Sequence, residues 1–96
     1  MAIPTVIKQP SESRLYTMEF AALLGSGETL STVVSVTVDK ATTPVLAISG
    51  QVVSGSQLQF RLAGGLNGTK YKVTGVVTTS AGNTLEGEGI VQLEDI

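Results

Sequence analysis

The sequence predicts an all-β domain folded as a two-layer sandwich. The chain of 96 residues is rich in Val, Thr, Ser and Gly, a composition typical of β structure. Short segments of alternating apolar and polar residues recur about every ten residues and are separated by turn signals. Tyr71 stands two residues into one such segment, directly after a glycine-rich corner. These features are typical of an immunoglobulin-like (fibronectin III-like) β-sandwich of about seven antiparallel strands.

The segment around Tyr71 organises the predicted domain. Residues 62–86 are expected to form a strand end, a Gly/Asn turn, a long strand, a tight hairpin and the start of the last strand. In β-sandwiches a tyrosine at this place closes the corner, because its hydroxyl bonds to the backbone a few residues upstream and its ring fills the end of the core. The alternative is that Tyr71 is an ordinary large strand residue.

Period-two alternation predicts the strands that precede this segment. The inward side chains expected of them are Tyr16, Met18, Phe20 and Ala22 in residues 14–24, Val34, Val36 and Val38 in residues 30–39, and Leu58, Phe60 and Leu62 in residues 57–63. Residues 25–28 form a loop between the first two strands. Residues 45–53 form a weaker strand, in which Gly50 indicates a bulge or a bend.

The last two predicted strands, residues 70–79 and 84–95, are joined by a hairpin at residues 80–83. Glycine and asparagine in this turn accept the positive φ that short hairpins require. The inward face is expected to carry Tyr71, Val73, Gly75, Val77, Thr79, Leu85, Gly87, Gly89, Val91 and Leu93. Glycines on that face weaken the packing or let another backbone approach.

Residues 1–13 are predicted to be an extended N-terminal arm, and residues 14–96 the sandwich domain. Pro4 and Pro10 remove ladder donors, which favours an arm or an edge segment over an inner strand. A disordered terminus is the alternative. The apolar residues Ile3, Val6 and Ile7 have no obvious role in a solvated tail, so a functional arm would dock on a neighbouring subunit.

Composition excludes several function classes. The chain has no histidine and no cysteine, which removes Ser-His triads, disulfides and thiolate metal sites. Its formal net charge is −2 and its basic residues are scattered, whereas a nucleic-acid surface needs a clustered basic patch. No signal peptide is recognisable in residues 1–13. No apolar run reaches the roughly 20 residues of a membrane helix.

The remaining chemical candidates favour structural roles. Glu86, Glu88, Glu94 and Asp95 lie close in sequence, but carboxylates alternating along a strand are typical of a solvated edge. Residues 64–70 lack the spacing and the following helix of a phosphate-binding loop, and the glycosylation pattern at residues 67–69 has no secretion signal beside it. Lys70 and Lys72 face Glu86 and Glu88 and could form exposed pairs. We therefore assign no catalytic, cofactor-binding or metal-binding residue.

The order of the motifs resembles a family of small tailed-phage proteins, the fibre-tail adaptor or Ig-like virion proteins. The similarity covers nearly the whole chain and rests on residues 10–20, 24–31, 36–38, 62–65, 68–73 and 78–82. The resemblance implies a non-enzymatic structural protein that is made in the bacterial host cytoplasm, enters the virion and bridges neck or tail components. Its implied partners are tail, neck or portal proteins and fibres, in several copies arranged by virion symmetry, with no cofactor, nucleic acid or membrane.

Two other functions remain compatible with the predicted fold. A capsid decoration or host-surface adhesion module needs the same sandwich and an exposed binding loop. A carbohydrate-binding accessory domain needs exposed aromatic rings, whereas the four aromatic residues of this chain are all expected to point inward.

Overall fold

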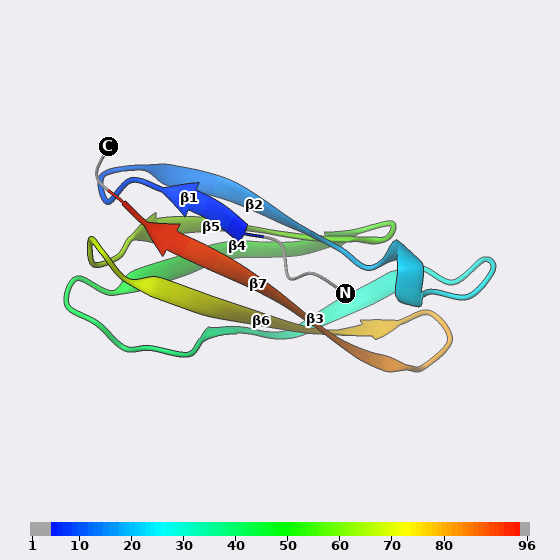
Figure 1. Cartoon of the computed structure of the whole chain (residues 1–96). Coiled ribbons are helices and arrows are strands. Elements are labelled where there is room, and N and C mark those ends of the chain that lie inside the picture. Colours follow the sequence, from blue (N-terminus) through cyan, green and yellow to red (C-terminus); the bar gives the residue numbers. More distant parts are fainter. Residues whose placement is uncertain (1–4, 95–96) are drawn as a thin grey trace.

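The structure, a computed structural model, describes residues 5–94. These residues form the elements β1 (Thr5–Lys8), β2 (Ser13–Glu19), the short 3-10 helix η1 (Ala21–Leu23), β3 (Leu30–Val38), β4 (Leu46–Ser54), β5 (Gln57–Gly64), β6 (Lys70–Thr79) and β7 (Thr84–Leu93). One sheet has the strand order β1-β7-β6-β3 and the other has the order β2-β5-β4. The two sheets enclose one core (Figure 1), so the predicted all-β sandwich is confirmed.

The strand pairs are antiparallel except at one edge. β1 and β7 run parallel, with Thr5 opposite Ile90 and Lys8 opposite Leu93, which corrects the expectation of a wholly antiparallel fold. The chain reverses after β1 and enters β2 in the other sheet, so β1 pairs only with the outer edge of β7. The groups β2-β5-β4 and β7-β6-β3 match the BED and GFC strands of an immunoglobulin sandwich. The immunoglobulin-like assignment itself stays a prediction.

The first long strand is shorter than predicted. β2 ends at Glu19, and η1 follows. Ala22 was expected on the buried face, and this prediction is wrong because Ala22 lies in η1 and is exposed. The N–H of Phe20 donates to the carbonyl of Ser56 (2.9 Å), and the chain turns away from the sheet directly afterwards. Phe20 itself remains buried as predicted.

The predicted orientation of Val34 is also wrong. Val34 is 59% exposed, because the register between β3 and β6 shifts between Val33 and Ser35. A bulge of this kind inserts one residue and reverses the alternation on one side of it. Val33 therefore packs against the core in place of Val34. The predicted bulge at Gly50 is confirmed, since this residue has a φ of +63° and the register of β4 shifts around it.

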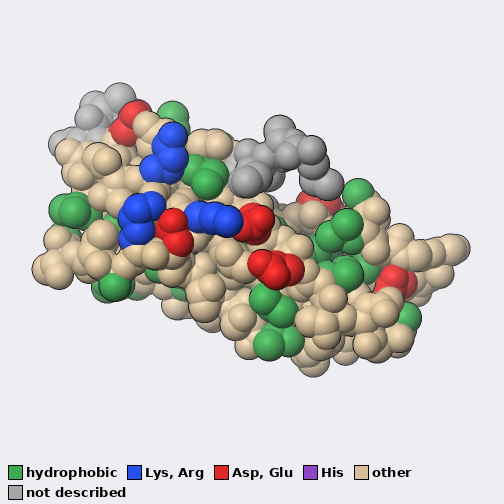
Figure 2. All heavy atoms as spheres, turned by 60° about the horizontal axis from the view of Figure 1, so that its bottom comes forward, with side chains coloured by type: hydrophobic (Ala, Val, Ile, Leu, Met, Phe, Trp, Pro, Cys, Tyr) green, Lys and Arg blue, Asp and Glu red, His purple; other side chains and the backbone are tan. Residues whose placement is uncertain are grey.

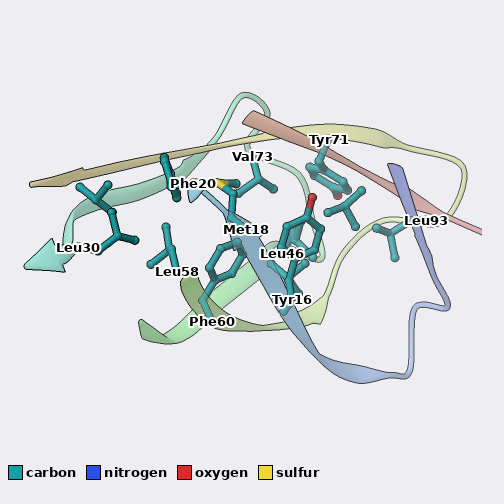
Figure 3. Packing of buried hydrophobic residues seen from close by; sticks show 13 residues of the cluster. Tyr16, Met18, Phe20, Leu30, Leu46, Leu58, Phe60, Tyr71, Val73 and Leu93 are labelled. Carbon is teal, nitrogen blue, oxygen red and sulfur yellow. The ribbon is translucent and has the colours of Figure 1, made fainter. Parts of the chain in front are cut away.

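The core contains large side chains of β2, and Phe20 directly after it, that pack against glycines of the facing sheet. Tyr16, Met18 and Phe20 are buried, and Tyr16 stacks on Phe60 with ring centroids 5.2 Å apart (Figure 3). The glycines opposite them on β6 and β7 are Gly75, Gly87 and Gly89. A β-carbon at any of these positions would collide with Leu58, with Phe20 or with a side chain of β2. Side chains, rather than another backbone, thus occupy the space that the glycines leave.

Part of the predicted N-terminal arm lies in the domain. Ile3 falls outside the described residues, but Thr5–Lys8 form β1 at the sheet edge. Val6 packs partly against the core, whereas Ile7 is 47% exposed. These four residues agree with the edge-segment alternative. The division into an arm (residues 1–13) and a domain (residues 14–96) stays a prediction.

Candidate interaction surfaces

One end of the sandwich, which we call the corner end, contains the loops of residues 39–45 and 64–69, beside the reversal between β1 and β2. The N–H of Leu66 donates to the buried hydroxyl of Tyr71 (2.9 Å), so the predicted tyrosine corner is confirmed. Thr42 Oγ1 lies 2.5 Å from the same hydroxyl and donates to the carbonyl of Pro44 at 2.8 Å. Because the single Thr42 proton is used there, Tyr71 is the donor to Thr42. This relay of hydrogen bonds fixes both loops to one core residue.

The opposite end, the hairpin end, consists of three loops, residues 24–29, 54–57 and 80–83. The carboxylate of Glu28 connects the first loop to the last. Its Oε1 accepts from the N–H of Gly25 (2.7 Å), and its Oε2 accepts from Thr79 Oγ1 (2.5 Å) and from Asn83 Nδ2 (3.0 Å). These hydrogen bonds, led by that of Gly25, lower the pKa of Glu28. The carboxylate is thus the ionised acceptor around which two loops are ordered.

Further hydrogen bonds attach the turn between β4 and β5 to this end. The N–H of Leu30 donates to the carbonyl of Gly55 (2.8 Å). Ser56 Oγ donates to the carboxylate of Glu19 (2.5 Å), and this bond is the main reason that the pKa of Glu19 is lowered. The hairpin end is therefore organised before any partner binds, which reduces the entropy that binding would cost.

At the corner end a lysine is fully buried. Lys8, the last residue of β1, is 0% exposed. Its ammonium donates to the carbonyls of Gly64 (2.7 Å), Gln9 (2.8 Å) and Pro10 (3.5 Å). Burial lowers the pKa of Lys8, while the nearby Glu12 and Tyr71 act in the opposite direction. The bond to Gly64 crosses from the edge strand of one sheet to β5 of the other.

Charge is distributed unequally along the sandwich. The sequence holds six basic residues, and all of them lie in the half nearer the corner end: Lys8, Arg14, Lys40, Arg61, Lys70 and Lys72. Three acidic residues, Glu19, Glu28 and Glu86, lie in the other half. On the face drawn in Figure 2, the blue side chains gather toward the left, and the right-hand part carries red side chains without blue ones. The two ends therefore offer different electrostatic surfaces to partners.

The acidic residues singled out in the sequence do not form a shared site among the described residues. Glu86 is exposed on β7, and Glu88 forms an ion pair with Lys72 (2.5 Å), so one of the expected cross-strand pairs is present. Hydrogen bonding to Glu88 raises the pKa of Lys72. Glu94 accepts from Gln92, and Asp95 falls outside the described residues. Residues 5–94 contain no cluster of three or more potential metal ligands.

Two organising side chains, Glu28 and Lys8, were missed by sequence reasoning. Glu28 was assigned only to a loop, because its partner Thr79 lies 51 positions further along the chain. The signal that was available is the Gly-Ser-Gly-Glu order, in which a carboxylate can reach back to a loop N–H. Lys8 follows Val6 at the period of a strand, so the same alternation that turns Val6 inward also turns Lys8 inward.

The fold and its two ends define a structural β-sandwich, a class in which a rigid scaffold positions interaction loops. The sequence model of the family described as "Podophage GP4 fiber-tail adaptor protein gp77" matches residues 8–92. The chain belongs to this family of bacteriophage tail adaptors, and the resemblance stated from the motifs is confirmed. Membership implies a structural component of the phage particle that interacts with other tail components such as fibres. No curated protein matches the chain. Among the described residues, no helix has the length and apolarity to cross a membrane.

Proposed function

We propose that this chain is a non-enzymatic adaptor that bridges a fibre to the neck or tail of a podophage. The observation that carries the proposal is the family match over residues 8–92. The structure supports it because a bridge needs two distinct surfaces. Here the half nearer the corner end holds all six basic side chains together with acidic ones, whereas the hairpin end carries acidic side chains without basic ones and is ordered around Glu28. Ends that differ in charge suit two different partners.

The contact surfaces in this proposal are the loop 25–29 and the N-terminal arm, residues 3–7. The hydrogen bonds of Glu28 fix the base of the loop, so the tip at residues 26–27 is already ordered when a partner binds. In the described part of the arm, Ile7 offers an apolar side chain that is 47% exposed. Ile7 is opposite Gln92 near the corner end, whereas the loop lies at the hairpin end, so the two surfaces can contact different partners.

The proposed adaptor is made in the bacterial host cytoplasm and enters the virion in several copies at symmetry-related positions, as tail components are symmetric. It works without a cofactor, nucleic acid or membrane. Repetition suits such a small domain, because each further contact within a ring is nearly intramolecular.

The decisive experiment uses phage particles assembled without this protein. Purified full-length chain is added to them, and fibre content, bound chain and infectivity are measured. The proposal predicts that the particles lack fibres and regain them in proportion to the chain bound. Particles that carry fibres in its absence would overturn the bridging role. Quantitative mass spectrometry adds the stoichiometry: a copy number near that of the portal supports a neck or tail position, and one near that of the major capsid protein would instead indicate decoration.

The loop surface is tested in the same assay with a matched pair of variants. Ser26→Trp places a bulky side chain at the tip of the loop without removing a bond of Glu28. Ser49→Trp places the same ring on the exposed outer face of β4. We expect Ser26→Trp to bind at least about tenfold less well, the loss of a well-placed contact, and Ser49→Trp to bind normally. The reverse result would remove the loop from the interface.

A further inference from the structure

Strand β1 is held by its backbone pairing with β7 and by one buried charged side chain, with little burial of apolar side chains. Only four residues pair with β7. Their side chains contribute one half-buried valine, Val6, to the core, while Thr5 and Ile7 are exposed. An edge strand with so little buried apolar area is among the first segments to open locally. Leaving its place would cost the four-residue ladder and the contacts of Lys8.

The contacts of Lys8 divide into two groups. Two of its carbonyl acceptors, Gln9 and Pro10, follow directly in the chain and move with β1. The third acceptor, the carbonyl of Gly64, belongs to β5 and stays with the body of the domain. Release of β1 returns the ammonium to water and removes its desolvation cost, which offsets part of the lost hydrogen bonds. The place vacated by β1, which we call the β1 seat, consists of the edge of β7 at residues 90–93 and the carbonyl of Gly64.

The hinge that follows β1 is short and held by local bonds. The N–H of Glu12 donates to the carbonyl of Gln9 (3.1 Å), and the N–H of Gln9 donates to Glu12 Oε1 (2.8 Å). Pro10 disfavours the helical region for the residue before it and so biases Gln9 toward extended backbone. Arg14 Nη1 donates to the carbonyl of Ile7 (3.3 Å) across the same reversal. The other contacts of β1 are its pairing with β7, the bond from the N–H of Glu94 to the carbonyl of Lys8 (3.0 Å), the packing of Val6 on the core and the bond from Lys8 to Gly64.

We propose that the β1 seat of one copy accepts β1 of a second copy, so that neighbouring chains are linked by exchanged strands. The occupant is fixed by chemistry on both sides, since the seat needs an extended segment with an apolar residue and, two positions later, a buried ammonium that reaches Gly64. Val6 and Lys8 of an identical chain provide both. Exchange of an identical element preserves the contacts of the closed form and alters only the hinge. Strand exchange is tested with the purified chain alone, so the result does not depend on whether the proposed tail function is correct.

The absence of cysteine in the sequence makes the test direct. Ile7 and Gln92 are opposite each other in the β1–β7 ladder, and strands paired in this way lie about 5 Å apart, within disulfide range. Chains carrying only Ile7→Cys and chains carrying only Gln92→Cys are mixed, incubated and oxidised. A disulfide between the two kinds of chain forms efficiently only when β1 of one copy is seated on β7 of another. The double variant Ile7→Cys/Gln92→Cys, in one chain, shows that the geometry can be bridged.

The control mixture combines chains carrying Thr32→Cys with chains carrying Thr78→Cys. These two residues are opposite each other in the β3–β6 ladder, and the heterodimer yield of this mixture measures cross-linking by random collision. We expect at least about tenfold more cross-linked heterodimer from the β1–β7 mixture, because seated cysteines react at an effective concentration far above that in solution. Adding Lys8→Met to the Ile7→Cys chain should reduce this excess. Equal yields in the two mixtures, with the double variant cross-linking within its own chain, would overturn the exchange. An excess unaffected by Lys8→Met would overturn the role given to the ammonium.

Discussion

The hydroxyl oxygen of Tyr16 lies 2.0 Å from the position that a β-carbon at Gly89 would take, too close for both atoms. Tyr16 lies on β2 and Gly89 on β7, so the contact joins the two sheets. We expect Gly89→Ala to reduce the free energy of unfolding by roughly 1–3 kcal/mol, the usual cost of overpacking a core. Urea denaturation measures the change. Gly25→Ala is the control, since its β-carbon would meet Glu28 Oε1 at an ordinary 3.5 Å.

The same pair of residues allows a double-mutant cycle. Tyr16→Phe removes the clashing oxygen, after which the nearest ring atom is Cζ at 2.9 Å from the same point. Gly89→Ala should therefore cost less in the Tyr16→Phe background than in the wild type, a coupling expected for residues in contact. Additive effects would show that Tyr16 is not the obstacle.

Tyr71→Phe should destabilise the corner end without disturbing the core. The ring remains, but the N–H of Leu66 and the hydroxyl of Thr42 lose a partner. We expect a loss of roughly 1–3 kcal/mol in the free energy of unfolding, because a polar group is left unsatisfied in a partly buried site. Hydrogen exchange should accelerate at the Leu66 amide, while amides at the hairpin end serve as the internal reference. Unchanged exchange at Leu66 would contradict the relay.

The hairpin end should loosen in acid. Hydrogen bonds hold the pKa of Glu28 below its ordinary value of 4.5, so the folded state binds fewer protons than the unfolded state in that range. The stability that this group contributes is complete above the unfolded pKa and is lost as the pH falls through the lower, folded pKa. Glu28→Gln should reduce stability near neutral pH and flatten its decline below about pH 4.5, an ordinary carboxyl pKa.

Glu86→Gln is the matched comparison for this acid response, because it removes the same charge from an exposed position on β7. Thermal unfolding between neutral and acidic pH should show a steeper decline for this variant than for Glu28→Gln. Parallel curves for the two variants would mean that the carboxylate of Glu28 does not organise the loops.

The bulge in β3 predicts opposite behaviour of two adjacent valines. Val33 packs against the core and Val34 is 59% exposed. Val33→Thr should lower the free energy of unfolding by about 1 kcal/mol, because a hydroxyl enters an apolar site, whereas Val34→Thr should leave it nearly unchanged. A urea midpoint that falls for Val34→Thr and not for Val33→Thr would contradict the bulge and would mean that Val34 faces the core.

Local patterns predicted the parts of the fold that depend on local physics. Tyr71, the turn glycines and the alternating strands could be recognised because each signal lies within a few residues of sequence. Val34 was misassigned because a bulge changes the register, and period-two alternation contains no information about an inserted residue. Ala22 was misassigned because β5 begins at Gln57: the bond from Phe20 to Ser56 is the last along this pair, and no partner strand extends beyond it.

The organisation of the ends was harder to predict for the same reason. Glu28 acquires its role from Thr79 and Asn83, and Lys8 from Gly64, partners that only the folded topology brings near. A charged residue in a sequence is by default a solvated one, so neither was singled out. The family-level function, by contrast, could be inferred, because the ordered set of motifs spans the chain.

The parallel ladder between β1 and β7 joins residues 85 positions apart. A ribosome makes each residue of β1 85 positions before the residue of β7 with which it pairs. During that interval the first strand of each nascent chain has no partner of its own. Closing so distant a pair is also slow, because long-range contacts require a large loop to be ordered first. On a polysome, where several chains emerge close together, β1 of one chain can therefore meet β7 of a chain ahead of it before its own β7 has been made.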